Sequence, residues 1–269
     1  MSTGFHIVVC AGIVPDPLQT LEPVSSPQGW TLKNEMMLPA CLDPWAMHAL
    51  FEAANLAKNT PDSKVWLVTL GPKAKVQQVM MTMAQKVPFE LVALDGAANG
   101  FTDATGTAEA LAGAIEGIDG LDKSRLLLFG GWESASRGAG ATLQIIGERL
   151  GITEQFQGVD QITVKDNGAM EILERVEGGS HQVSECSAPP AVLGWATGNL
   201  SEPPNNSQVG MQNMRFIMPA LQKAKPTAIG TGSIVYKSVE LPKQQRETRI
   251  VKDVPAEDIA REIVDWLRG

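Results

Sequence analysis

The sequence is poor in the residues that build disulfide frameworks and metal centres. Its 269 residues include three cysteines and three histidines. Cys10, Cys41 and Cys186 are widely spaced and follow no ligand pattern, which indicates buried thiols in a reducing compartment. These counts argue against a disulfide-rich secreted protein and predict no metal site.

Positive charge and long apolar runs are also scarce. The chain has 22 Lys+Arg against 30 Asp+Glu, a formal net charge of −8, which argues against non-specific nucleic-acid binding. No apolar run reaches the length that spans a membrane, and the residues from Met1 to His6 lack the features of a signal peptide. A strand-like segment follows directly, so no transit peptide is expected. With 43% hydrophobic residues the chain can bury a core, and we predict a soluble cytoplasmic protein.

The first half alternates strand-like and helix-like segments. The β-branched, apolar runs are Ile7–Ala11, Val65–Leu70, Leu91–Leu94 and Leu126–Phe129. The segments with helical spacing are Trp45–Lys58, preceded by the capping pair Asp43-Pro44, then Lys73–Lys86, Thr107–Gly117 and Thr142–Leu150. This alternation predicts an α/β fold with a Rossmann-like parallel sheet flanked by helices. Ligands of such sheets bind beyond the carboxyl ends of the strands.

The second half predicts an antiparallel extension and then an arm. Two strands, Val159–Lys165 and Met170–Val176, flank an Asn-Gly pair that favours a type I′ turn. Further strands are expected at His181–Cys186 and Ala191–Trp195, whereas Leu200–Gln212 is too rich in Pro and Asn for a regular element. Ala220–Lys225 predicts a short helix, and a mostly irregular stretch precedes an amphipathic helix at Ala256–Arg268. We therefore expect a nucleotide-binding α/β domain over residues 1–200 and a C-terminal arm over 201–269, although a loop-rich edge of the same domain fits the pattern equally well.

A glycine-rich segment between a predicted strand and a predicted helix, residues 129–142, is the best candidate for ligand binding. Its glycines permit close approach of the backbone, and amides at a helix start favour an anion. Arg137 is suited to a bidentate phosphate contact. Neither the Walker A nor the G-x-G-x-x-G spacing is present, so a purely structural turn remains an alternative.

No set of residues forms a recognisable catalytic centre. His48 lies within an apolar helix and is expected in the core, and His181 follows a turn and is expected to be exposed. No G-x-S-x-G or H-E-x-x-H motif occurs, and Met80, Met81 and Met83 are interpreted as core residues. A protein that binds a nucleotide without catalysing bond chemistry fits the sequence better.

Several motifs, in order along the chain, then resemble one family. They are the first strand with Cys10-Ala11, Asp43-Pro44-Trp45-Ala46 followed by Phe51-Glu52-Ala53-Ala54, Gly71-Pro72, Arg175–Gly179 through Pro190–Leu193, and Met218-Pro219-Ala220 through Lys223–Pro226. Together they resemble the β subunit of electron transfer flavoprotein, the FixA-like family, nearly from end to end.

The resemblance implies a heterodimer in which an α subunit holds the electron-carrying FAD and this chain holds AMP. It implies a donor dehydrogenase as a further partner, docking at Met218 and Pro219, and it places Trp45 near the flavin. The AMP positions carried over are Cys10, Asp43, Pro44, Trp45, Ala46, Leu70, Glu133, Ser134, Ser136, Arg137, Gly138, Gly140 and Thr142.

The glycine-rich segment departs from the family pattern. Ser136-Arg137-Gly138 replaces an acidic cluster, and Thr142 alone clearly survives from the Asn-Gln-Thr-Gly run that follows it. The Asp-Gly-Asp-Thr run of members with a second FAD for electron bifurcation is missing, so that use is disfavoured. The hypothesis is an electron carrier without catalytic residues of its own that binds an adenine nucleotide through Arg137 and the glycines. The alternatives are a stand-alone adenine-nucleotide-binding α/β protein and a bifurcating subunit with a second FAD.

Overall fold

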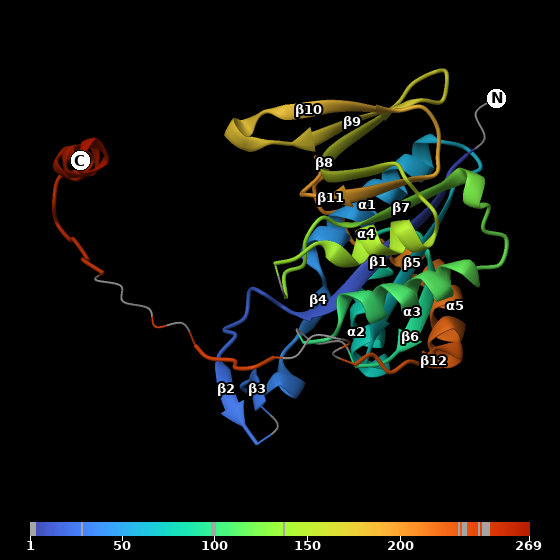
Figure 1. The fold of residues 1–269 in the computed structure, drawn as a ribbon, viewed down its shortest axis with the longest axis horizontal. Helices are drawn as coiled ribbons and strands as arrows, with labels where there is room; N and C mark the ends of the chain where they lie inside the picture. Colours follow the sequence, from blue (N-terminus) through green and yellow to red (C-terminus); the bar gives the residue numbers. More distant parts are fainter. Residues whose placement is uncertain are drawn as a thin grey trace. The chain divides into compact units, whose positions relative to one another are not determined.

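The computed structural model describes residues 4–27, 29–97, 101–136, 138–230, 232, 236–241, 243 and 248–269 (Figure 1). By contacts the chain divides into two units, Met1–Val235 and Tyr236–Gly269, which are described separately. The proposed boundary at residue 200 lies inside the first unit.

The first unit is built on one large sheet. Its strand order is β10-β9-β8-β11-β7-β1-β5-β6-β12, with β4 paired to β1 outside this path. The strands are β1 (His6–Pro15), β4 (Ala40–Leu42), β5 (Lys64–Gly71), β6 (Glu90–Asp95), β7 (Leu126–Gly131), β8 (Gln155–Val164), β9 (Met170–Arg175), β10 (His181–Cys186), β11 (Ala191–Trp195) and β12 (Lys225–Pro226). The pairs from β8 through β11, β7, β1, β5 and β6 to β12 are parallel, which confirms the predicted α/β fold.

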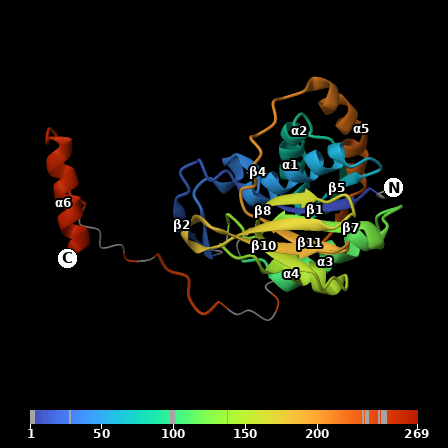
Figure 2. The same ribbon diagram turned by 90° about the horizontal axis from the view of Figure 1, so that it is seen from above.

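Helices cover both faces of this sheet, as Figure 2 shows. They are α1 (Pro44–Asn59), α2 (Lys73–Met83), α3 (Ala104–Glu116), α4 (Ala141–Arg149) and α5 (Ser207–Lys223). Alternate residues of β1 enter two separate cores: Ile7, Val9 and Ala11 pack with α1, α2 and α5, whereas Val8 and Cys10 pack with α3 and α4. The central strands are therefore apolar on both faces, as buried parallel strands must be.

Local sequence signals explain most helix starts. The Asp43 side chain accepts a hydrogen bond from the Trp45 amide, and Pro44 occupies the first position of α1, as predicted. Asp103 caps α3 in the same way, so α3 starts three residues before the predicted Thr107. α2 ends at Met83, three residues before the predicted Lys86. Met80 and Met83 are core residues as predicted, but Met81 is exposed.

The antiparallel extension is present, but its first turn is not the predicted type I′. Asn167 keeps a negative φ and only Gly168 is left-handed, with a φ of 87°. The Gly168 amide donates to the Lys165 carbonyl at 2.9 Å, and the Lys165 amide donates to the Ala169 carbonyl at 2.8 Å. These bonds describe a three-residue loop with a left-handed glycine at its end, the next most common hairpin loop. β8 itself begins earlier than predicted, at Gln155.

The predictions around residues 200–225 are wrong in part. Ser207–Gln212 belongs to α5, and the predicted short helix at Ala220–Lys225 is the end of that same 17-residue helix. Asn206, interpreted as a helix breaker, is the N-cap and accepts from the Gln208 and Val209 amides. Pro219 lies within the helix, where it removes one backbone hydrogen bond without ending the helix.

Asn213 anchors α5 to the connection between α2 and β6. Its side-chain nitrogen donates to the carbonyls of Ala84 and Val87, each at 2.7 Å, and its oxygen accepts from the Phe89 amide at 3.4 Å. We expect Asn213→Ala to lower the free energy of unfolding by about 2 kcal/mol, because it leaves buried backbone groups unpaired. Urea denaturation measures this loss. The exposed neighbour Gln212→Ala is the control, and an equal effect of both substitutions would contradict the anchoring role.

Between β1 and β4 lies a small hairpin that the sequence analysis does not predict. It pairs β2 (Pro23–Ser26) with β3 (Gly29–Leu32), and the 3-10 turn η1 (Glu35–Met37) follows. Further 3-10 turns are η2 (Lys123–Arg125) and η3 (Glu177–Gly179).

The second unit contains α6 (Ala256–Arg268), as predicted. Its described residues before Pro255 form no helix or strand. Among the described residues of the whole chain, no helix is long and apolar enough to cross a membrane.

Candidate functional site at the carboxyl edge of the sheet

The carboxyl ends of β1, β5 and β7 lie side by side in the centre of the sheet. Cys10 on β1 is in register with Gly130 on β7, and Gly12 is in register with Leu70 on β5. The chain passes from β1 to β5 on one side and later places β7 on the other side of β1. The carboxyl end of β1 is therefore the topological switch point, where α/β sheets bind their ligands.

Asp43 joins three segments at this point. Its amide donates to the Gly12 carbonyl at 2.9 Å, and its carboxylate accepts from the Trp45 amide at 3.2 Å, the Ala135 amide at 2.9 Å and the Ser134 hydroxyl at 3.2 Å. The side chain is buried, with the residue 4% exposed. Burial raises the pKa of this carboxyl, and the hydrogen bonds offset part of that rise. The Asp43 carboxylate thus ties the start of α1 to the glycine-rich segment, and the Asp43 amide ties both to the end of β1.

Two glycines of the glycine-rich segment are required by close packing. A Cβ atom on Gly131 would collide with the Cβ of Trp45, and one on Gly140 would collide with the Trp132 carbonyl oxygen. Ser136 adds bonds within the segment, since its amide donates to the Ser134 hydroxyl at 3.2 Å. The segment is therefore folded compactly against the start of α1.

The remaining residues predicted to bind the nucleotide do not all lie at one place in the structure. Cys10 and Leu70 belong to the core formed with α3 and α4, whereas Ala46 belongs to the core on the opposite face of the sheet. Burial raises the pKa of Cys10 to about 12, so its thiol stays protonated. Glu133, Gly138 and Gly140 lie in the segment before α4, and Thr142 lies in the first turn of α4. Pro44 begins α1, and Arg137 lies outside the described residues.

Trp132 is a candidate site residue that the sequence analysis missed. Its ring stands nearly perpendicular to that of Trp45, with 6.4 Å between the ring centroids. Its indole nitrogen is buried and has no hydrogen-bond partner among the described residues. A tryptophan directly after two strand-terminal glycines was the available signal. The pair places two aromatic rings beside the buried Asp43 carboxylate.

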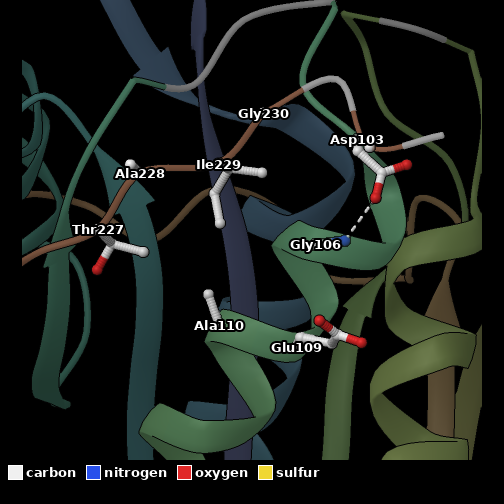
Figure 3. Close-up of a pocket in the computed structure, with 9 residues that line it drawn as sticks. Asp103, Gly106, Glu109, Ala110, Thr227, Ala228, Ile229 and Gly230 are labelled. Carbon is white, nitrogen blue, oxygen red and sulfur yellow. Dashed lines mark hydrogen bonds between the residues drawn. The ribbon is translucent and has the colours of Figure 1, made fainter. Parts of the chain in front are cut away.

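A cavity of about 320 Å³ lies further along the same edge (Figure 3). β12 pairs with the end of β6, and residues 227–230 then run past the start of α3. The two acidic side chains of the cavity already have partners. Asp103 accepts from the Gly106 amide at 2.7 Å, and Glu109 pairs with Arg149. Of the residues predicted for the nucleotide, none that the structure describes lines this cavity.

A second cavity, of about 330 Å³, lies where β11 ends. Arg175 makes a bidentate ion pair with Asp160, at 2.9 and 2.7 Å, and also donates to the Thr197 hydroxyl at 2.7 Å. The His181 Nε2 atom lies 2.9 Å from Asp160 Oδ2, the same oxygen that accepts from Arg175 Nε. His181 is exposed, as expected, but its long-range partner Asp160 could not be read from the sequence. Burial acts to raise the pKa of Asp160, but the bonds and charges of Arg175 and His181 outweigh it and hold that pKa below its usual value.

Glu52 on α1 supports the loop beside this second cavity. Its carboxylate accepts from the Asn199 amide at 3.0 Å, and it packs against Gly198, which has a φ of 62°. Burial raises the pKa of Glu52, and hydrogen bonds from the Asn199 and Leu200 amides offset part of the rise. The loop after β11 is thereby held against α1.

The raised pKa of Glu52 gives a pH prediction. An acid with a raised folded pKa costs stability as pH rises from its unfolded pKa, about 4.3, through its folded pKa. The wild type should therefore lose free energy of unfolding relative to Glu52→Gln as pH increases through that window. Urea denaturation of both proteins from about pH 4 to about pH 7 measures the difference. A difference that is constant with pH would contradict the assignment.

The residues predicted to dock a dehydrogenase lie on α5. Met218 is 38% exposed, and Met211, seven residues earlier and so on the same side of the helix, is also exposed. The sequence of α5 has no acidic residue and includes Arg215 and Lys223. The outer side of α5 is thus apolar with basic neighbours, on a chain that is acidic overall.

The fold defines an α/β protein with a parallel sheet, and this edge is its topological switch point, the place where proteins of this class commonly bind ligands. The model of the electron transfer flavoprotein domain family matches residues 34–227, more than half of the chain. The chain therefore belongs to the electron transfer flavoprotein domain family. No match was found among curated proteins.

Proposed function

We propose that this chain is the β subunit of a heterodimeric electron transfer flavoprotein, which passes electrons from a dehydrogenase to a quinone-linked or other acceptor. The observation that carries the proposal is the junction at Asp43. There the Asp-Pro-Trp-Ala start of α1 and the glycine-rich segment, two regions singled out in the sequence, meet at the switch point of the sheet.

The redox chemistry is assigned to FAD on an α subunit. No residue of this chain carries out the electron transfer, and its contribution is to position the flavin domain. Trp45 is the residue proposed to lie near the flavin, because it begins α1 at the carboxyl edge and is only partly buried. The perpendicular Trp132 ring would hold Trp45 in place.

An adenine nucleotide, AMP rather than a second FAD, is proposed to bind in the glycine-rich segment. The Ala135 and Trp45 amides are already used by Asp43, so the phosphate needs other donors. The start of α4 offers them, because its N-cap residue Gly140 makes no side-chain capping bond and the first amides of a helix lack backbone partners. Thr142, in the first turn of α4, adds a hydroxyl at the same place.

Identification of the released nucleotides tests this assignment. The chain is co-expressed with its α subunit, the purified heterodimer is denatured, and the nucleotides are separated and counted. We expect one FAD and one AMP per heterodimer. FAD alone at one per heterodimer would remove the nucleotide site, and two FAD would support the bifurcating alternative.

The second unit, Tyr236–Gly269, is proposed to lie on the α subunit. The apolar residues Ile259, Ile263, Trp266 and Leu267 recur at spacings that place them on one face of α6. Such a face is stabilised by an apolar surface, and we assign that surface to the partner. The co-expressed complex should be yellow and should contain both chains, whereas a stand-alone nucleotide-binding protein would be purified without flavin. We also propose a cytoplasmic location.

A further inference from the structure

The segment Arg175–Gly179 stands out in the sequence but has no part in the proposed nucleotide site. Three of its residues, Arg175, Val176 and Gly179, line the cavity at the end of β11, together with residues from β8, β10 and the loop after β11. We propose that this cavity binds an anionic oxygen group, a carboxylate or a phosphate. The proposal goes beyond the proposed function and does not depend on it.

Arg175 is held in one orientation with part of its charge accessible. Its Nε and Nη2 atoms donate to Asp160, and Nη2 also donates to Thr197. These bonds do not use the N–H groups on Nη1, which remain available to a ligand. The Arg175 side chain is 40% exposed, whereas that of Asp160 is 7% exposed. A ligand entering the cavity therefore meets the guanidinium and not the carboxylate behind it.

The other accessible groups also favour an anion. The side chain of His181 is 39% exposed, and its Nε2 atom lies 2.9 Å from Asp160 Oδ2, so its other ring nitrogen is not used by that carboxylate. Thr197 accepts from Arg175, so its hydroxyl hydrogen is free to donate elsewhere. Among the nine lining residues in the described part of the chain, Asp160 is the single acidic one, and it is already paired.

The backbone leaves room for such a ligand. Gly178 and Gly179 both have positive φ, 76° and 73°, and a Cβ atom on either would meet nothing within 4 Å. The turn thus has open space beside it and no side chains to fill that space. Val176, which lines the same cavity, is 42% exposed. The exposed, apolar Val176 fits a carboxylate presented by a protein, whereas the polar lining residues fit free phosphate equally well.

The three histidines allow a direct test by NMR. The full-length chain, without a partner, is titrated with inorganic phosphate and separately with acetate, and the imidazole signals are followed. We expect the His181 signal to shift at low millimolar concentrations, while those of His6 and His48 stay in place because they lie away from the cavity. Sodium chloride at matched ionic strength should have no comparable effect.

Substitutions test which residues of the cavity bind the anion. Arg175→Gln should reduce the phosphate-induced shift by about tenfold or more, because the charged donor is lost. Since that change also leaves Asp160 unpaired, Thr197→Val provides a second, milder variant, for which a smaller reduction is expected. Arg149→Gln, which removes an exposed, ion-paired arginine on α4, is the matched control and should leave the shift unchanged.

The same titration distinguishes the two sources of the anion. If the natural occupant is a carboxylate of a protein partner, complex formation should abolish the response of His181 to phosphate. If the occupant is a free anion, the response should persist in the complex. The absence of any His181 shift in the full-length chain, or equal shifts of all three histidines, would overturn the proposal while leaving the proposed function intact.

Discussion

Replacing Asp43 by alanine should lower the free energy of unfolding by about 3 kcal/mol, since it removes a helix cap and two further hydrogen bonds to a charged acceptor. The Trp45 amide would lose its cap, and the Ala135 amide and the Ser134 hydroxyl would lose the group that holds the glycine-rich segment to α1. Burial of the Asp43 carboxylate raises its pKa and costs part of the free energy that its hydrogen bonds contribute. The expected loss on substitution is therefore smaller than the sum of those bonds. Urea denaturation at neutral pH measures the effect.

Asp103→Ala is the matched control for this prediction. Asp103 caps α3 through one bond to the Gly106 amide, but its carboxylate does not connect separate segments in the way that Asp43 does. Its loss should therefore cost about 1 kcal/mol, the usual value of a cap. Asp43→Asn, which keeps one acceptor oxygen, should fall between the two alanine variants. Equal losses for Asp43→Ala and Asp103→Ala would show that the bridging bonds contribute nothing.

A second readout separates stability from function. If the glycine-rich segment holds an adenine nucleotide, the Asp43→Ala heterodimer should retain FAD and lose most of its AMP, because the start of α4 follows directly from the loosened segment. Nucleotide analysis of the purified complex measures both. Unchanged AMP content in a correctly folded variant would place the nucleotide elsewhere.

The parts of this fold that could be predicted are those with local signals. Asp43-Pro44 marks the start of α1, and the strand Ala191–Trp195 is observed with the predicted bounds. The alternation of strands and helices predicted the parallel sheet, because the helix between two parallel strands packs on a face of the sheet. The start of α5 was missed for an equally local reason: Asn206 was interpreted as a breaker, although asparagine is also a good helix cap.

The candidate site was predictable only where its residues are neighbours in sequence. Neither the contact between Trp132 and Trp45 nor the group of Asp160, Arg175 and His181 has a sequence pattern, because their members come from different strands and helices. It was predictable that Cys10 and Ala46 would lie on opposite faces of the sheet. Successive strand residues face opposite sides, so Cys10 and Ala11 enter different cores, and Ala46 packs in the core of Ala11.

Replacing Met218 by aspartate should reduce electron transfer from the cognate dehydrogenase by at least about 30-fold in kcat/KM, the effect of losing one anchoring side chain of about 2 kcal/mol. This prediction follows from the proposed function. Met218 is exposed on α5, and the basic residues Arg215 and Lys223 on that helix fit an acidic docking surface. An added carboxylate would remove apolar contact and oppose such a surface. Reduction of the heterodimer by the dehydrogenase, followed by flavin absorbance, measures the effect.

Met81→Asp distinguishes docking from a general effect of charge. Met81 is an exposed methionine on α2, and its replacement should leave the rate of reduction unchanged. FAD content should be the same in both variants and in the wild type, since neither side chain is placed at the flavin. If Met218→Asp instead loses FAD, the outer side of α5 belongs to the interface with the α subunit. If it keeps both FAD and the full rate, the dehydrogenase docks elsewhere, and the basic, apolar side of α5 requires a different partner.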